Sequence, residues 1–358
     1  IDPTLFNQPA LKFLKNIPVS TNPCGTLNYG ISQNSHDNDI VGRVDYTKSA
    51  RQSMFVRYYY AHFVLPIGTG AATNILEANQ VAQNDQDQTI TFGDNYSLSS
   101  NSVNVFTLSL ARTYAYREIP PYPDPADLGI PVYSPIPHFM GISVSGAFSL
   151  GSGGTNPGHF NSTAPQVADD FTTLRGNHQI QLGVSWEHAI MNTVNNRPTN
   201  GAFSFGTSFT GLGMTDFLMG DVSNFLQGNP DWENDRENLL GVYAQDAWKI
   251  SPRLSLSYGL RWEPLFQQYN WEKNRWVENF DLSRFAAGIR SNVYANAPAG
   301  LLFPGDAGYP GNAGYSYNRV KDTEPRVGVI WDPTGSGRTS IRASYGMFFD
   351  RPQMFFYT

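Results

Sequence analysis

Hydrophobic and polar side chains alternate strictly along several stretches of this chain. The clearest stretch is 254–263, in which Leu254, Leu256, Tyr258, Leu260 and Trp262 alternate with Ser255, Ser257, Gly259, Arg261 and Glu263. Because successive side chains of a β-strand point to opposite faces, this pattern predicts a strand between two unlike environments. A soluble sandwich strand with its apolar face in a core fits the pattern, and so does a membrane barrel strand with its apolar face in lipid.

The same alternation recurs along the chain and predicts five hairpins. Their first strands are expected at 39–47, 88–97, 165–174, 238–250 and 325–332, and their second strands at 54–60, 106–111, 180–187, 254–262 and 340–349. The connectors are short, at 48–52, 98–102, 175–177, 251–253 and 333–339. They are rich in Ser, Gly, Asn and Pro, which form turns for steric reasons.

The opposite ends of the predicted strands lead into long segments, at 64–86, 117–163, 192–236 and 265–324. Long irregular loops are uncommon inside compact soluble domains. Here they occur at every second connection, always at the same end of the strands. Short turns at one end and long loops at the other are typical of an outer-membrane barrel. The sequence therefore predicts an all-β fold: an antiparallel transmembrane β-barrel segment with short periplasmic turns and long extracellular loops.

Other all-β folds fit less well. A β-propeller would show an internal repeat of about 40–50 residues, and the chain has none. A soluble sandwich would rarely carry four long loops on one side, but a secreted carbohydrate-binding sandwich remains an alternative.

Composition agrees with a barrel. Aromatic residues make up 14% of the 358 residues and charged residues only 15%, which suits amphipathic strands better than helices. The net charge of -6 argues against a nucleic-acid partner. No apolar run of about 18 residues exists, so a helical membrane span is not expected. The single cysteine, Cys24, has no partner for a disulfide or a zinc site.

Three segments resemble a known family: DIVGRVDYTKSARQSMFVRYYY (39–60), DRENLLGVYAQDAWKISPRLSLSYGLRWEP (235–264) and EPRVGVIWDPTGSGRTSIRASYGMFFDRP (324–352). They are similar to barrel segments of TonB-dependent outer-membrane receptors. Segments 211–230 and 296–311 resemble loops of the Oar-like branch of that family, whose members usually carry an N-terminal carboxypeptidase-regulatory-like domain.

The resemblance implies the barrel part of a transporter in the Gram-negative outer membrane. About ten strands are expected, whereas such transporters have about 22 around a plugged lumen. We therefore expect a fragment without the plug and without either barrel end: an irregular lead-in at 1–37 and a partial barrel at 38–358. The implied partners are outer-membrane lipid, the plug domain, the remaining strands, TonB and an unknown scarce solute such as a siderophore or oligosaccharide.

No catalytic constellation is visible, so an enzyme is not expected. The chain has no nucleophile elbow, no phosphate-binding loop with its lysine and no H-E-x-x-H motif. The six histidines lack metal-ligand spacing, and the acidic tract 84–88 lacks the glycine and glutamate of a calcium loop. We expect no cofactor and no metal.

Charged residues fall in the polar phase of the predicted strands: Arg43, Asp45, Arg57, Glu187, Arg261, Glu263 and Arg342. We expect these side chains to face the lumen and to form cross-strand ion pairs, or to contact the plug or a passing solute. We expect no charge in the apolar phase of the strands. Since Arg or Lys on the lipid face costs about 2–4 kcal/mol at mid-depth, this absence favours a barrel.

Aromatic residues of the long loops are candidates for ligand capture by stacking: Trp271, Trp276, Tyr309, Tyr315 and Tyr317. The alternative is an aromatic girdle at the outer interface, combined with packing of the loops on each other. A second functional alternative is a surface scaffold for adhesion or secretion that transports no solute. The sequence does not name the substrate.

The predicted orientation is testable by insertion of a protease-sensitive tag. On intact cells, a tag near Gly153 or Asn274 should be cut, because long loops face outward, and a tag at Ser336 should be protected. Immunoblotting after protease treatment measures the cleavage, and the opposite pattern would overturn the topology.

Overall fold

The computed structural model describes most of the chain. The described residues are 2–68, 74–76, 81–151, 157–196, 198–272, 278–311, 314–351 and 354. Gly153, Asn274 and Trp276 lie outside them.

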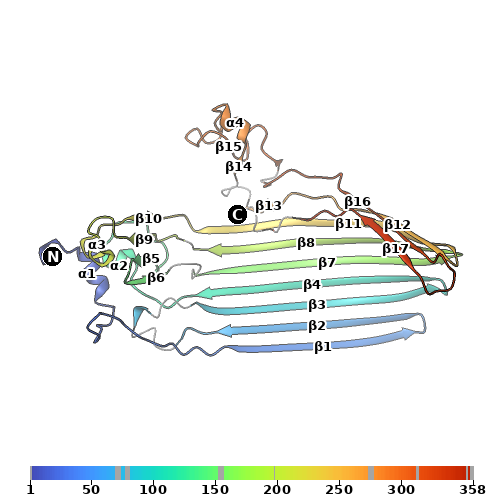
Figure 1. Ribbon diagram of the computed structural model, residues 1–358, viewed down its shortest axis with the longest axis horizontal. Coiled ribbons are helices and arrows are strands. Elements are labelled where there is room, and N and C mark those ends of the chain that lie inside the picture. The colour runs from blue at the N-terminus through green and yellow to red at the C-terminus, as the bar shows by residue number, and fades with distance from the viewer. Residues whose placement is uncertain are drawn as a thin grey trace.

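One large antiparallel sheet forms the body of the molecule (Figure 1). Its strands are β1 (His36–Ser49), β2 (Gln52–Leu65), β3 (Ala82–Ser99), β4 (Ser102–Glu118), β7 (Gly158–Arg175), β8 (His178–Asn195), β11 (Asp231–Ser251), β12 (Leu254–Trp262), β16 (Thr323–Trp331) and β17 (Ile341–Gly346). Each strand pairs with the next one in this order, and a short β13 (Tyr269–Asn270) also pairs with β11. All five predicted hairpins are therefore confirmed.

Three of the tight turns share one local device. Ser49, Ser99 and Ser251 each end a first strand, and each Oγ accepts a hydrogen bond at 3.2 Å from the backbone N–H two residues later. The strand register shifts just before each of these serines. A short polar side chain that bonds its own backbone closes a turn without a longer loop. This explains why such brief connectors join strands of up to 21 residues.

Several strands extend further towards the long loops than the alternation predicts. The predicted loop 64–86 is already β3 from Ala82 onward, and the predicted loop 192–236 is strand at both of its ends. In 84–88 the added strand residues are polar in both phases. Hydrophobic periodicity cannot reveal such a strand, because backbone pairing and polar cross-strand contacts, such as Thr113 with Asp87 and Arg117 with Asp85, hold it.

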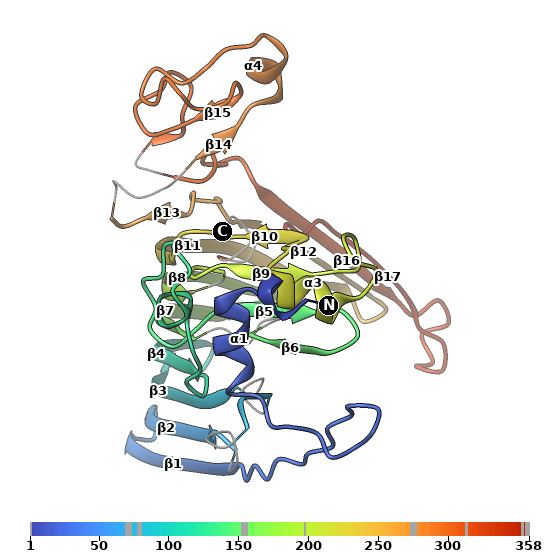
Figure 2. The same cartoon turned by 90° about the vertical axis from the view of Figure 1, so that its left-hand side faces the viewer.

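The sheet is curved and open (Figure 2). β1 and β17 form its two free edges among the described residues. The apolar phase is uncovered: Leu108 is 45% exposed, Leu182 46% and Leu260 51%. A soluble sandwich would bury such side chains between two sheets. A single curved sheet with an exposed apolar face is instead a barrel wall. None of the described helices is long and apolar enough to cross a membrane.

The apolar phase is not free of charge, which corrects the sequence-based expectation. Asp94, Asp169 and Asp246 lie in it, on first strands of their hairpins, near the tight turns. Each carboxylate accepts a hydrogen bond from a polar neighbour: Gln52 at 2.9 Å, Asn104 at 2.6 Å and Tyr258 at 2.8 Å, respectively. Acidic residues cost less than Arg or Lys on a lipid face, and least near the interfaces.

The long loops fold into compact structure. Three of the segments that adjoin the strands pack together into a body that we call the cap. These segments are 2–17, 119–151 and 198–227. The cap contains the 3₁₀ turn η1 (Pro3–Leu5), α1 (Gln8–Leu14), α2 (Pro125–Leu128), α3 (Gly213–Met219) and a small sheet of β10 (Asn224–Leu226), β9 (Ala202–Phe205), β5 (Gly141–Val144) and β6 (Phe148–Leu150). It lies at the loop end of the sheet (Figures 1 and 2).

The cap has its own hydrophobic core. Phe13, Phe139, Met140, Leu150 and Phe217 are each at most 3% exposed. The expected lead-in 1–37 thus contains a helix, because Asn7 caps α1 and Ala10 and Phe13 of that helix are buried in the core. The fourth segment, 263–322, carries β13, β14 (Asn279–Phe280), α4 (Leu282–Ala286) and β15 (Leu301–Leu302). Its outer part projects away from the sheet (Figure 1).

The two faces of β12 should respond differently to a new charge. Leu256 lies in the apolar phase between Trp248 and Val329, so Leu256→Arg should lower the folded fraction in outer membranes, at a cost of up to about 2–4 kcal/mol. Ser257→Arg should be better tolerated, since Ser257 lines a hollow of about 420 Å³ on the other face. Heat-modifiable mobility on gels measures the folded fraction.

Equal losses for the two variants would contradict a lipid-facing apolar phase. Gly259 is no substitute control, because a Cβ there would lie 2.6 Å from Cβ of Gln245.

Candidate functional site

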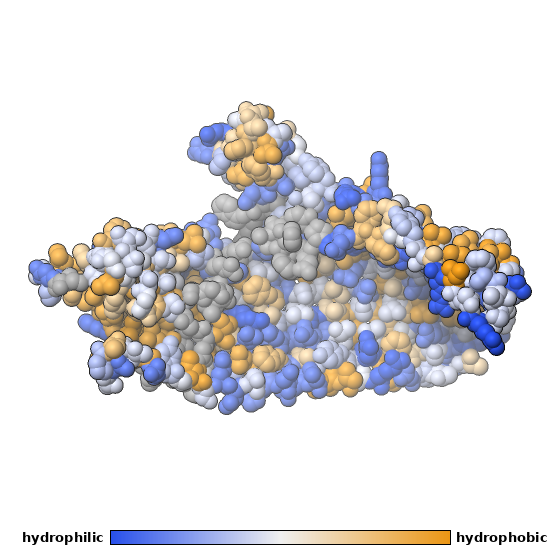
Figure 3. Space-filling view, viewed as in Figure 1, coloured by the Kyte–Doolittle hydropathy of each residue, from blue (hydrophilic) through white to orange (hydrophobic). Residues whose placement is uncertain are grey.

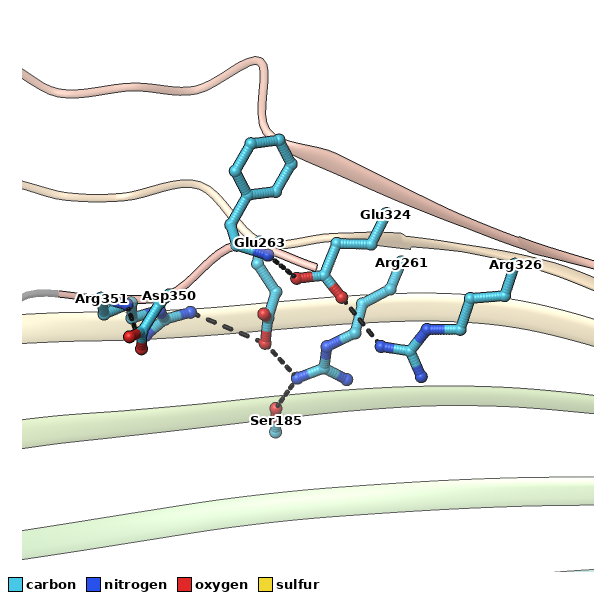
Figure 4. Close-up of polar contacts among 8 residues, drawn as sticks. Ser185, Arg261, Glu263, Glu324, Arg326, Asp350 and Arg351 are labelled. Atoms are coloured by element: carbon cyan, nitrogen blue, oxygen red, sulfur yellow. Dashed lines mark hydrogen bonds and ion pairs between the residues drawn. The ribbon is translucent and has the colours of Figure 1, made fainter. Parts of the chain in front are cut away.

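A charged network lies on the polar face of β8, β12 and β16 (Figure 4). Arg261 Nη2 donates to Glu263 Oε1 at 2.5 Å and to Ser185 Oγ at 3.4 Å. Arg326 Nη2 donates to Glu324 Oε2 at 2.8 Å. Each arginine thus pairs with a glutamate two positions away along the chain, because residues i and i+2 share one face of a strand.

The chain beyond β17 turns back onto this network. Met347 N donates to Pro325 O at 3.1 Å, and Phe349 N donates to Glu324 Oε1 at 3.1 Å. Arg351 Nη2 lies 3.7 Å from Glu263 Oε1. Residues 349–351 therefore contact both glutamates (Figure 4). The network holds a polypeptide segment against the wall by one charged and one backbone contact.

A second acidic group lies on β11. Glu233, Asp235 and Glu237 point to the same face and are 9%, 0% and 3% exposed. Tyr315 Oη donates to Asp235 Oδ1 at 2.8 Å, and Gln268 Nε2 donates to Glu237 Oε2 at 3.0 Å. Burial and the neighbouring Asp235 carboxylate raise the pKa of Tyr315, so its hydroxyl keeps the proton that it donates.

These contacts anchor segment 263–322 to the wall. β13 pairs with Asp235 and Arg236, and isolated bridges join Leu239 to Leu265 and Leu265 to Arg319. The anchored part covers carboxylates on the polar face of the sheet. In the space-filling view, hydrophilic residues with scattered hydrophobic ones lie over the sheet between the cap and the opposite end (Figure 3).

The charged residues predicted from the sequence do not all contact one another. Arg43 pairs with Asp45 at 2.7 Å along β1, and both side chains are exposed. Arg57 is opposite Arg43, a like charge, so the expected cross-strand ion pair does not form there. Arg261 is opposite Tyr243 on β11 and Glu324 on β16, but its ion pair is with Glu263, along the chain.

Glu187 lies opposite Gln166 and Leu239, and Arg342 is at the tight-turn end of β17, where its Nε donates to Ser340 Oγ at 3.4 Å. Only Arg261 and Glu263 enter the network. Its other members, Glu324, Arg326 and Arg351, were not among the predicted residues. Glu324 and Arg326 continue the alternation of β16, so the period-2 signal was present for both.

The predicted aromatic residues are dispersed. Trp271 is 62% exposed, with the Arg236 guanidinium 6.0 Å from its ring centre. Tyr309 is half-buried, and burial raises its pKa to about 12. The Tyr317 hydroxyl donates to the Gly308 carbonyl within the same segment, and that of Tyr315 is bound to Asp235. These rings form no common stacking platform among the described residues.

The cap contains an apolar cavity of about 220 Å³ between its helices and its small sheet. Its walls include Phe13, Met140, Phe203, Phe205 and Phe217. The cavity is open on one side, because Gly129 and Pro131 at its rim are exposed. The expected aromatic loop residues lie elsewhere.

One group of side chains in the described residues has metal-like spacing. Single ligand atoms of Asp124, Asp127 and His138 lie within 4.8 Å of one another. Asp124 and Asp127 form the capping box of α2, and Asp124 Oδ2 accepts from the His138 backbone N–H at 3.0 Å. Capping accounts for the position of both carboxylates.

The anchor of segment 263–322 should depend on Tyr315. Tyr315→Phe removes a hydrogen bond to a buried carboxylate, which is worth about 1.5–3 kcal/mol, so protease should cut 278–311 at least several times faster. Tyr317→Phe is the matched control, because that hydroxyl bonds only within the segment. Time courses of cleavage on the purified protein measure the rates. Similar rates for both variants would contradict an anchor at Tyr315.

Comparison with solved structures finds matches with TM-scores below 0.5. The outer membrane transporter YddB from Escherichia coli is 10% identical, with a TM-score of 0.47, over 90% of this chain and 33% of that one. The ferric-catecholate import receptor Fiu from E. coli K12 is 11% identical, with a TM-score of 0.46, over 87% and 43%. The chain thus spans less than half of these proteins. Among curated proteins, none matches the sequence.

A protein-family model described as an outer membrane beta barrel domain matches residues 1–357. The match covers nearly the whole chain and agrees with the curved antiparallel sheet, its exposed apolar face and its short turns. The chain therefore belongs to the outer membrane beta barrel domain family and is a protein of the Gram-negative outer membrane.

Proposed function

We propose that this chain is the barrel part of a TonB-dependent outer-membrane transporter, and that its polar face contacts a plug domain. Residues 38–358 supply wall and external loops, and the lead-in 1–37 reaches the cap. The wall encloses a solute path, while gating and energy come from the plug and from TonB. The Oar-like resemblance of 211–230 and 296–311 supports this branch of the family.

The observation that carries the proposal is the charged network at Glu263 and Glu324. These glutamates already hold a chain segment, residues 349–351, against the polar face. A plug inside a barrel needs contacts of this kind: directional, polar and breakable. Apolar contacts would be spread over the whole surface of a plug, so a pull at one point would not release it. Charge-assisted hydrogen bonds are stronger than neutral ones, yet each is local.

A scaffold for adhesion or secretion is the second candidate, favoured by the folded cap and by the projecting outer part of segment 263–322. The two functions differ in their need for TonB. We expect cells that express the full-length protein to remove at least one solute from a complex medium only when TonB is present. Mass spectrometry of the medium from isogenic strains measures this. Identical depletion with and without TonB would favour the scaffold.

The network itself gives a sharper test. Glu263→Gln with Glu324→Gln should leave assembly intact but loosen the plug, so that protease cuts it at a clearly lower urea concentration and TonB-dependent depletion falls several-fold. The matched control is Arg43→Gln with Asp45→Asn. That ion pair lies on β1, on the same polar face of the sheet as the network but away from it. Unchanged plug protection in the glutamine variant would contradict a plug contact here.

A further inference from the structure

We propose that the apolar cavity of the cap is a binding site for a small, uncharged aromatic or branched aliphatic group that carries one hydrogen-bond acceptor. The inference specifies which class of compound the external loops would capture, and in that respect it rests on the proposed function. The cavity itself is a property of the cap and needs no uptake to be occupied.

The cavity is preformed: its floor belongs to the packed core of the cap, and its rim at Gly129 and Pro131 is exposed. Phe13, Phe217 and Met140 in its wall are 1%, 3% and 1% exposed. The ring of Phe217 contacts those of Phe205 at 5.1 Å and Phe13 at 6.1 Å between centroids, both edge to face. Such contacts fix the rings in place. A ligand would therefore enter a shaped pocket without having to order loose loops, which preserves its binding free energy.

Size selects the ligand. A cavity of about 150 Å³ lined by aliphatic and aromatic groups stays dry and takes up benzene. The cavity of the cap, at about 220 Å³, has room for a benzene ring with a substituent of two or three atoms. A larger fused system would enter only in part and leave the rest in solvent at the open rim, because the side chains of the floor are closely packed by their own neighbours.

A charged ligand is disfavoured. Among the described residues, none that lines the cavity carries a charged side chain, and most of the lining is Phe, Ile, Leu, Met, Val and Pro. The nearby Lys12 ammonium is already bound to the Leu128 carbonyl at 3.3 Å. An ionised carboxylate or ammonium group would lose its water without gaining a partner, at a high free-energy cost. The site therefore discriminates a neutral ring from its carboxylate analogue.

Asn7 adds one polar contact. Its Oδ1 accepts from Ala10 N at 3.3 Å and so caps α1, while its side-chain amide N–H groups make no hydrogen bond to a described residue. Gly220 leaves space for that amide, since a Cβ at 220 would lie 2.6 Å from Asn7 Nδ2. Both residues line the cavity. This partly exposed amide donor at the edge of an apolar pocket favours a ligand with a single acceptor, such as a ketone or an ester.

The test uses the full-length protein in lipid nanodiscs and three fluorinated probes: 4-fluoroacetophenone, 4-fluorocumene and 4-fluorobenzoate. Fluorine NMR follows binding, and empty nanodiscs correct for partition into lipid. We expect saturable binding of the ketone, weaker binding of the hydrocarbon and none of the anion. Absence of saturable binding of both neutral probes would overturn the site.

Two variants locate the binding. Val222→Phe fills the cavity and should weaken ketone binding at least tenfold, whereas Val132→Phe should not change it, because Val132 packs on the same core but does not line the cavity. Equal affinities of these variants would overturn the location. Failure of TonB-dependent uptake would leave all of these values unchanged, so the two proposals fail separately.

The donor is tested by Asn7→Ser, which keeps a capping oxygen for α1 but is too short to reach a ligand. The preference for the ketone over the hydrocarbon should fall about fivefold, the usual weight of one neutral hydrogen bond. Binding of the hydrocarbon should persist. An unchanged preference would overturn the role of Asn7.

Discussion

The ladder of backbone hydrogen bonds between neighbouring strands is the constraint on which the rest of this structure depends. In hydrocarbon no water is available for an unpaired N–H or C=O, and each one costs several kcal/mol. Ten successive strands meet this requirement by pairing each with the next, from β1 to β17. Once every backbone N–H and C=O group in the sheet is hydrogen-bonded in this way, the side chains on one face of the sheet can be apolar and those on the other face polar. Among the described residues of these ten strands, only the outer edges of β1 and β17 have no neighbouring strand.

Outside the membrane a different rule applies, and the chain changes its construction accordingly. Water surrounds the external segments, so apolar side chains gather there into a core, as in any soluble domain. The cap brings together α1, α3 and the small sheet from three segments far apart in the sequence. One protein thus has two hydrophobic surfaces of opposite kinds: an exposed one on the strands, which lipid covers, and a buried one in the cap.

Charge is distributed by the same logic. The polar face holds Arg261, Glu263, Glu324 and Arg326 in paired contacts, and the run on β11 is covered by β13 and Tyr315. Buried carboxylates persist only where donors meet them. Carboxylates in the apolar phase, such as Asp169 with Asn104, follow the rule as well.

Much of the fold can be read from the residues alone, because a strand with two unlike faces must alternate. The alternation at 254–262 locates β12, and the short polar connectors locate five hairpins with their turns at one end. The same alternation places Arg261 and Glu263 on one face, and it extends to Glu324 and Arg326.

The alternation contains no information about contacts between distant segments. The polar extensions of β3 and β11 are strands only because neighbours pair with them. Arg351 reaches Glu263, and Tyr315 reaches Asp235, only after the chain turns back. The cap and its cavity form only where Phe13, Met140 and Phe217 pack together. These residues are far apart in the sequence, so no local pattern of side chains predicts their contact.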